Sequence, residues 1–348
     1  MAMVSILLAV TLSWGSVSVY KRLLFIRGVA ISSAMALLFQ VSSVRLLLSG
    51  KVLAACMLLF IILSGAHAEV FRFAPEDGSK SIERTRREII TEVAAGNHRS
   101  KEVDIAKSVV ERVVRVTDHA IFVTLTETDA NRIVDGRPFD NPSQTLLRNK
   151  PTTRVFDKER GFLRLEGCDS LIADAKRIFP ESQHAFLEVV FSPQVLEQRE
   201  KDTWMKLEGG RLVGMEVARG GRWENEEDYG EIGKPYKVTT LTRVTDIESS
   251  KEALKVTLLT FYTNDRSFLK RVDSESVTSL KDPAVEDYLS WNVGNLPLLK
   301  GASLIILDAR TLRIMHREQI EIQVMDTPEG LKTRTEHGVS QIEYSRPK

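Results

Sequence analysis

The residues of this sequence that are best suited to chemistry are its histidines and acids, and they are sparsely placed. Five histidines follow Glu69, and none lies within four residues of another, so no local pair is spaced to hold a metal ion. Asp118 and His119 are adjacent, which suits a carboxylate that orients a general base, although in a turn the same pair commonly stabilises the backbone. The local signatures of serine hydrolases, zinc proteases and phosphate-binding loops are missing from the sequence. The sequence therefore favours a non-catalytic protein, with a hydrolase that has a dispersed acidic site as an alternative.

A run of acids between Trp223 and Tyr229 is the nearest approach to a cation site. Oxygen-rich loops suit calcium, but this run has neither the alternating spacing nor the closing bidentate glutamate of a calcium loop. We therefore interpret it as a solvated loop and predict no metal site and no cofactor. The acids are Glu224, Glu226, Glu227 and Asp228.

Four aromatic residues lie in or beside segments that are not predicted to be strands. They are Trp204, Trp223, Tyr288 and Trp291. Such side chains either seal the packing of helices on a sheet or line an apolar pocket between them, which is where ligands settle. We take these four as the candidate ligand-binding residues, and the ligand they indicate is apolar.

The segment 1–68 ends in the pattern of an export signal. An apolar run over 52–63 follows Arg45 and Lys51 and precedes a small-x-small cleavage site that ends at Ala68. A membrane-spanning helix needs roughly 20 apolar residues, so this run is short for a permanent anchor. The pattern predicts an extracytoplasmic protein, periplasmic or secreted, that starts near Glu69.

Three features of the same segment leave alternatives open. The sequence before Cys56 resembles a lipoprotein-processing box, and an uncleaved signal would act as a membrane anchor. Two further apolar stretches precede residue 44, which indicates either a start codon at Met35 or a membrane hairpin before the signal. A lipid at Cys56, an uncleaved signal or a hairpin would associate the chain with a membrane through this segment, whereas a start at Met35 would only shorten the signal.

The charge balance excludes one class of partner. Five of the 48 basic residues and none of the 47 acidic residues lie before Glu69, so the remainder carries 43 basic and 47 acidic residues. A nucleic-acid-binding protein commonly shows a basic excess, so we predict no nucleic-acid partner. After residue 68 only Cys168 is left, so the exported part has no internal disulfide, and we expect this thiol to be buried.

Alternation of β-branched and aromatic residues with charged residues predicts a β-rich chain after Glu69. The segments 82–93 and 103–116 carry enough charge for helices, but their valines and threonines favour strands. The predicted strands are 82–93, 103–116, 120–128, 154–156, 162–165, 212–217, 236–244, 254–263, 303–307, 312–316, 320–324, 332–336 and 339–344, with a turn at 117–119 and loops over 129–150 and 218–235.

Three helices are predicted to cover the strands. Asp169 can cap a helix over 171–179, and Ser192 followed by Pro193 starts a second helix that reaches Leu207. A third, short helix begins at Pro283 and ends near residue 294. Each has one apolar stripe, as expected of helices that pack on a sheet.

These elements define an α+β fold of predominantly antiparallel strands, built as curved meander sheets with a few covering helices. The sequence Arg-Val-Thr-Asp occurs at 115–118 and again at 243–246, each time followed by a β-branched strand. This repeat suggests two similar halves, about 69–167 and 211–348, joined by a helical middle segment over 168–210.

The chain also resembles a known class of proteins. The features that carry the likeness are Phe71-x-Phe73 with Gly78, the hairpin over 157–167 before a helix, and the Trp223 segment before Tyr236. Together they look like exported bacterial β-rich proteins of unassigned function, from Glu69 to about Thr263. By analogy, such proteins have the half-open sheet of periplasmic lipid carriers, and the resemblance implies no catalytic residues. The sequence thus indicates an envelope protein that binds an apolar ligand or a protein partner, and the alternative is a structural or assembly factor that uses its sheet edges.

Overall fold

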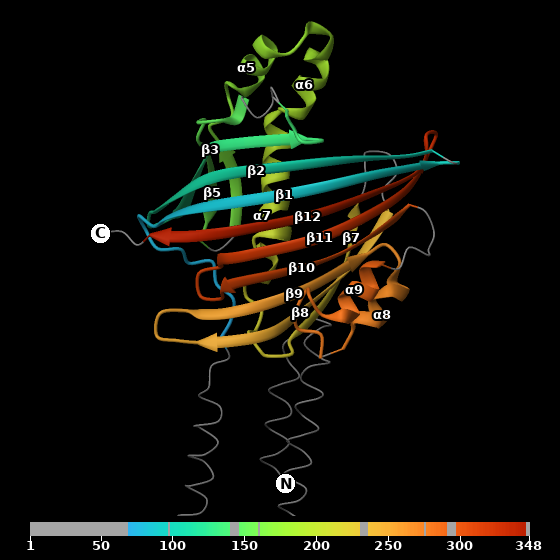
Figure 1. Ribbon diagram of the computed structural model, residues 1–348. Helices are drawn as coiled ribbons and strands as arrows, with labels where there is room; N and C mark the ends of the chain where they lie inside the picture. The colour runs from blue at the N-terminus through green and yellow to red at the C-terminus, as the bar shows by residue number, and fades with distance from the viewer. Residues whose placement is uncertain are drawn as a thin grey trace, which may run out of the picture. The chain divides into compact units, whose positions relative to one another are not determined.

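A single antiparallel sheet of twelve strands dominates the described part of the chain (Figure 1). The computed structural model describes residues 69–96, 98–139, 146–158, 161–229, 236–274, 276–290 and 297–345, so the predicted export segment and Trp291 lie outside the described residues. The strands are β1 (Lys80–Ala95), β2 (His98–Val116), β3 (Ala120–Val134), β4 (Arg137–Pro138), β5 (Thr152–Asp157), β6 (Gly161–Glu166), β7 (Arg222–Tyr229), β8 (Tyr236–Ser249), β9 (Leu254–Thr263), β10 (Leu298–Asp308), β11 (Arg313–Thr327) and β12 (Gly330–Ser345).

The strand order is β6-β5-β3-β2-β1-β12-β11-β10-β9-β8-β7, and β4 pairs with β3. Most neighbours in the sheet are also neighbours in sequence, as in a meander. There are two exceptions. Strand β3 pairs with β5, past the short β4, and at the centre β1 pairs with β12 over a ladder from Lys80 opposite Ser345 to Ala94 opposite Leu331. The first and the last strand of the described chain therefore lie side by side at the centre of the sheet. This arrangement confirms the predicted class of predominantly antiparallel sheet with a few helices.

Several strands are longer than the sequence pattern indicated. Strand β2 has 19 residues, whereas a typical strand has about 5–6. The predicted strands 312–316 and 320–324 form one strand, β11, and the two that follow form one strand, β12. Polar residues interrupt the apolar pattern at 317–319, but the ladder to β10 and β12 continues through them because both neighbours are long enough to pair there.

Three predicted segments were wrong. The loop over 129–150 begins later, because β3 extends to Val134 before Asp135 and Gly136 turn the chain at positive φ into β4. The predicted loop over 218–235 contains β7, an edge strand paired with β8, in which Glu224, Glu226 and Asp228 are exposed on one face and Glu227 lies on the other. The predicted strand over 212–217 is a 3-10 turn with one isolated bridge between Glu216 and Val70.

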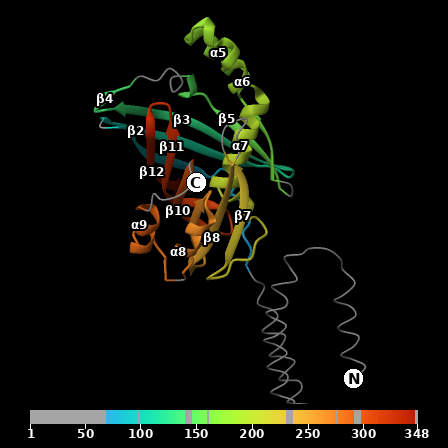
Figure 2. The ribbon, with the colours of Figure 1, turned by 90° about the vertical axis from the view of Figure 1, so that its right-hand side faces the viewer.

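Side chains of successive residues alternate between two faces of the sheet, and helices cover both faces. We call the inner face the one that carries Ser81, Glu83 and Thr85 of β1, together with the side chains opposite them, among them Arg112 and Tyr344. The other face is the outer face. Figure 1 shows one long helix behind the sheet and two short helices in front of it, and Figure 2 shows the same layers from the side.

The helices are α5 (Leu171–Ile178), α6 (His184–Val190), α7 (Pro193–Leu207), α8 (Leu269–Val272) and α9 (Pro283–Ser290), with 3-10 turns at Glu181–Gln183, Gly210–Leu212 and Arg266–Phe268. Helix α7 begins as predicted, with Pro193 in its first turn and the Ser192 hydroxyl accepting a hydrogen bond from the Val195 backbone N–H. Helix α5 also matches the prediction, but Ser170 and not Asp169 occupies its N-cap position. The sequence patterns did not indicate α6 or α8, which have seven and four residues.

The main apolar core lies on the outer face. Helices α8 and α9 pack there on β8, β9 and β10, and the cluster includes Phe261, Phe268, Val285 and Leu298. The inner face has two further clusters, one around Val256 and Leu307 and one around Phe156. A fourth cluster holds α5, α6 and the start of α7 together beyond the edge of the sheet.

The two copies of Arg-Val-Thr-Asp occupy different positions in the fold. The first ends β2 and enters the turn to β3, whereas the second lies inside β8, where a register shift falls between Val244 and Asp246. The turn that follows β8 comes later, at 250–253. The internal duplication therefore stays a prediction.

Candidate ligand pocket

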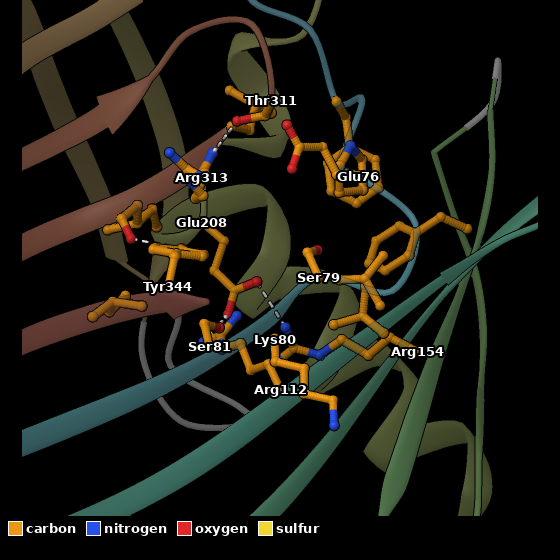
Figure 3. Close-up of a pocket in the computed structure, with 18 of the residues that line it drawn as sticks. Glu76, Ser79, Lys80, Ser81, Arg112, Arg154, Glu208, Thr311, Arg313 and Tyr344 are labelled. Carbon is orange, nitrogen blue, oxygen red and sulfur yellow. Dashed lines mark hydrogen bonds and ion pairs between the residues drawn. The ribbon is translucent and has the colours of Figure 1, made fainter. Parts of the chain in front are cut away.

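A pocket opens on the inner face of the sheet, between the strands and the end of α7. The empty space in and in front of it, open solvent at its mouth included, is about 810 Å³. Figure 3 shows its polar side chains, which come from segments far apart in the sequence. The apolar lining residues are Phe73, Pro75, Val114, Val123, Phe156, Trp204, Leu312, Ile314 and Ile342, and the polar ones are Glu76, Ser79, Lys80, Ser81, Arg112, Arg154, Glu208, Thr311, Arg313 and Tyr344.

Three aromatic rings form the apolar wall. The ring centroids of Phe73 and Phe156 lie 4.8 Å apart, and Trp204 lies 5.8 Å from the first and 5.3 Å from the second. All three contacts are tilted or edge-to-face, which are the arrangements that aromatic pairs prefer. The segment before β1, strand β5 and helix α7 each contribute one ring, so the contacts among the three rings hold these elements together.

Two glycines leave room for the Trp204 ring. A Cβ at Gly210 would lie 2.6 Å from the indole Cδ2, and a Cβ at Gly161 would lie 2.8 Å from the indole Cη2. Neither position can carry a side chain without displacing the ring, because real Cβ contacts are not this short. Gly161 also has a φ of +80°, which favours glycine for the backbone alone. The absence of these two side chains therefore leaves the space that the indole occupies.

A network of buried and half-buried ion pairs forms the base of the pocket. Glu208, just after α7, accepts hydrogen bonds from Arg112 of β2 at 3.1 Å and from Arg154 of β5 at 2.7 Å. Arg112 also donates to Glu83 of β1 at 2.5 Å, and the set is completed by pairs between Arg317 and Glu83 at 3.1 Å and between Arg154 and Glu200 at 2.5 Å. Three arginines and three glutamates thus balance, which is what buried charges need.

The network holds its carboxylates ionised. Burial alone would raise the pKa of Glu208, but the guanidinium groups of Arg112 and Arg154 outweigh it and hold that pKa well below its ordinary value. Burial likewise opposes ionisation of Glu83, and Arg112 and Arg317 again lower its pKa. The base of the pocket is therefore a fixed, charge-balanced platform over the ordinary pH range.

Arg313 and Tyr344 form a separate part of the wall. The guanidinium carbon of Arg313 lies 4.6 Å from the centroid of the Tyr344 ring, in a cation–π contact. The Tyr344 hydroxyl donates to the Ile314 carbonyl at 2.7 Å, and burial raises the pKa of this hydroxyl. The phenol is therefore a fixed, neutral surface on which the arginine lies.

Three of the four predicted ligand-binding residues lie in the described part of the chain, and these three do not form one site. Trp204 lines the pocket and is 6% exposed. Trp223 lies in strand β7, contrary to the prediction that placed it outside the strands, and its ring packs edge-on against Phe71. Tyr288 belongs to α9 and is buried between this helix and the outer face of the sheet, where its hydroxyl donates to the Tyr262 carbonyl at 2.9 Å. Trp291 lies outside the described residues.

The other candidates for chemistry lie away from the pocket. Asp118 and His119 are exposed in the turn between β2 and β3, and Thr117 supplies the hydrogen bonds to Ala120 that hold this turn. Cys168 is half-buried, not fully buried as predicted, and burial raises the pKa of its thiol. The acids of 224–228 stand on strand β7, and the described residues contain no group of three or more side chains placed to ligate a metal ion.

Sequence reasoning did not identify Arg112, Arg154, Glu208 or Arg313 as site residues. A usable signal for Arg112 was present, since Val110 and Val114 flank it on its own face of the strand. A charged residue between two valines of one face indicates either an exposed sheet or a buried ion pair. The sequence alone did not distinguish these two cases.

No protein-family model and no curated protein matches this chain. Similar solved structures include lipovitellin, studied for its lipid–protein interactions, with 11% identity, a TM-score of 0.41 and coverage of 78% of this chain. Others are DynF from the dynemicin biosynthesis pathway of Micromonospora chersina, with 8% identity, a TM-score of 0.18 and coverage of 81% of this chain and 88% of DynF, and the translocator domain of the autotransporter NalP from Neisseria meningitidis, with 6% identity, a TM-score of 0.17 and coverage of 83% and 94%. The chain spans about a quarter (26%) of the lipovitellin chain it matches. All three TM-scores lie below 0.5, so these likenesses define no family, and function is argued from the pocket.

None of the helices in the described residues has both the length and the apolar character needed to cross a membrane.

Proposed function

We propose that this chain is an exported, non-catalytic binding protein of the cell envelope that takes an apolar or amphipathic small molecule into the pocket on the inner face of its sheet. The observation that carries the proposal is the pocket itself, an opening walled by Phe73, Phe156 and Trp204. An apolar wall of this kind gains about 25 cal/mol for each Å² of apolar ligand surface that it removes from water.

The polar base of the pocket supports binding more than catalysis. Each carboxylate in the base is already paired with a guanidinium group, and the pKa values of Glu83 and Glu208 lie below the ordinary value. A general acid or base needs a pKa near the working pH, and neither group meets this requirement. The ion pairs instead fix the end of α7 to strands β2 and β5, so the pocket is preformed.

The proposed location rests on the apolar run at 52–63 and the small residues that end at Ala68. The N-terminal sequence of the mature protein tests it. A mature chain that begins near Glu69 supports export with cleavage, and one that begins at Cys56 with an attached lipid supports the lipoprotein alternative.

A fluorescence experiment on the full-length chain tests the pocket directly. A variant with Trp14, Trp223 and Trp291 changed to phenylalanine keeps Trp204 as its reporter. A long-chain alcohol with bromine atoms on its chain should quench this fluorescence strongly, because bromine quenches an indole only near contact.

The matched control has Trp14, Trp204 and Trp291 changed to phenylalanine and keeps Trp223 as its reporter. Trp223 packs on Phe71 and does not line the pocket, so the same alcohol should quench it weakly. Equal quenching of both reporters, or none of Trp204, contradicts the proposal. Native mass spectrometry of the purified chain, followed by extraction with organic solvent, then identifies any molecule carried from the producing cell.

A further inference from the structure

One cation in the pocket wall has no acid to pair with. Arg313 contacts the Tyr344 ring, and no carboxylate of the described residues lies within 4.0 Å of its guanidinium nitrogens. Its Nε–H is buried and donates to no acceptor among the described residues. The residue as a whole is half-buried, and no carboxylate of the described residues lies beside its positive charge to balance it.

Arg112 also has a buried Nε without a partner, but Arg112 and Arg154 differ from Arg313 in pairing with carboxylates. Arg112 contacts Glu83 and Glu208, and Arg154 contacts Glu200 and Glu208. Carboxylates of the protein therefore balance the positive charges of these two arginines. Arg313 adds a positive charge to a base that is already neutral.

The two charged residues at the mouth do not supply the missing partner. Glu76 and Lys80 are both exposed, carry opposite charges and form no ion pair with Arg313. They lie in solvent of high dielectric constant, where charges interact weakly. The uncompensated positive charge of the pocket is therefore that of Arg313.

We infer that the ligand is a single-chain amphiphile whose anionic head group, a carboxylate or a phosphate, pairs with the guanidinium of Arg313 while its hydrocarbon chain lies against Phe73, Phe156 and Trp204. This inference rests on the proposed function. Oxyanions of both kinds match the planar fork of a guanidinium group. Figure 3 shows Arg313 and Tyr344 on one side of the pocket and Arg154 of the charged base on the other.

The test compares three probes that share one hydrocarbon chain, namely tetradecanoic acid, tetradecyl phosphate and tetradecanol, each below its critical micelle concentration. The full-length chain is used, and each probe displaces a neutral fluorescent dye such as N-phenyl-1-naphthylamine. The acid or the phosphate should bind about 10-fold to 100-fold more tightly than the alcohol, which is the range expected for a charge-assisted hydrogen bond. The tighter of the two anions identifies the head group.

The variant Arg313→Gln should remove this preference, so that the anions bind no more tightly than the alcohol, while the affinity for the alcohol stays within about twofold. Arg313→Lys should keep most of the preference, since the charge is retained. Arg115→Gln is the matched control, because Arg115 also lies over an aromatic ring, that of Phe122 at 4.2 Å, and is not part of the pocket.

The outcomes separate the two proposals. If all three probes bind equally to the unaltered chain, the anionic head group is wrong and the apolar pocket stands. If none of them displaces the dye, the proposed function fails as well. Retention of the preference in Arg313→Gln places the anion elsewhere and overturns the role of this arginine, and alcohol binding by the variant shows that it is folded.

Discussion

Replacing Glu208 with glutamine removes the central carboxylate from beneath the pocket. Its side chain is 12% exposed and is the acceptor that Arg112 and Arg154 share, at 3.1 and 2.7 Å. Glutamine keeps the shape and one acceptor oxygen but loses the charge. Glu208→Gln therefore tests whether the network stabilises the fold by charge.

The expected cost follows from what remains after the substitution. Removing one partner of a buried ion pair commonly costs about 3–5 kcal/mol, because the other charge is left buried. Here Arg112 keeps Glu83 at 2.5 Å and Arg154 keeps Glu200 at 2.5 Å, so neither arginine loses all of its partners. We expect a loss near the lower end, about 3 kcal/mol, which lowers the melting temperature by roughly 6 °C or more for a domain of this size.

The measurement is thermal or urea unfolding followed by circular dichroism, with a matched exposed pair as control. Glu343 pairs with Arg84 at 2.8 Å, at a distance similar to those in the network, but the two side chains are 72% and 51% exposed. Glu343→Gln should cost less than about 1 kcal/mol. If Glu208→Gln is no more destabilising than Glu343→Gln, burial of the network does not matter and the reasoning is refuted.

The same network sets the acid limit of stability. The pKa of Glu208 and that of Glu83 are lower in the folded chain than the ordinary value of 4.5, so the unfolded chain binds protons first as the pH falls. Their contribution is fully present above about pH 4.5 and is lost as the pH falls through the lower folded values. Stability measured against pH should therefore decline below pH 4.5, and less steeply in Glu208→Gln; an unchanged slope would contradict this assignment.

Two glycine substitutions test close packing in the sheet and in the pocket. Gly301→Ala would place a Cβ 2.2 Å from Cζ of the cross-strand Tyr262, so the ring must move, at a cost of about 1–3 kcal/mol in unfolding free energy. The control is Gly338→Ala on β12, whose Cβ would meet nothing within 4 Å and which should cost less. Equal losses in the two variants would contradict this prediction. Gly210→Ala would place a Cβ 2.6 Å from the Trp204 indole and should shift the emission of Trp204 and weaken dye binding several-fold; an unchanged spectrum and affinity would contradict the contact.

The strands after residue 69 were largely predictable, and the reason is local. The valines of 103–116 prefer extended backbone whatever they contact, and the structure has β2 there. The boundaries of β11 were not predictable in the same way, since pairing with β10 and β12 carries the strand through its polar residues 317–319. Existence of a strand is a local property, and its length depends on its neighbours.

Helix α7 likewise combines a property that depends on local sequence with one that depends on distant partners. Ser192 and Pro193 determine where it starts, so its position in the sequence could be read directly. What it does depends on Trp204, Glu200 and the Glu208 that follows it, and each of these acts through a partner from another segment of the chain. The sequence predicted the helix and Trp204 as a candidate, but not the charged platform beside it.

Arg112 shows most clearly what could not be predicted from the sequence. Both faces of β2 carry valines and charges, so alternation does not show which face is buried, and an arginine between Val110 and Val114 fits an exposed strand equally well. Its two acids are 29 and 96 residues away in sequence, one on the neighbouring strand and one at the end of α7. A buried charge is tolerated only where such partners converge, and their convergence is a property of the strand order. The pocket could therefore be recognised only after β1, β2 and α7 were placed together.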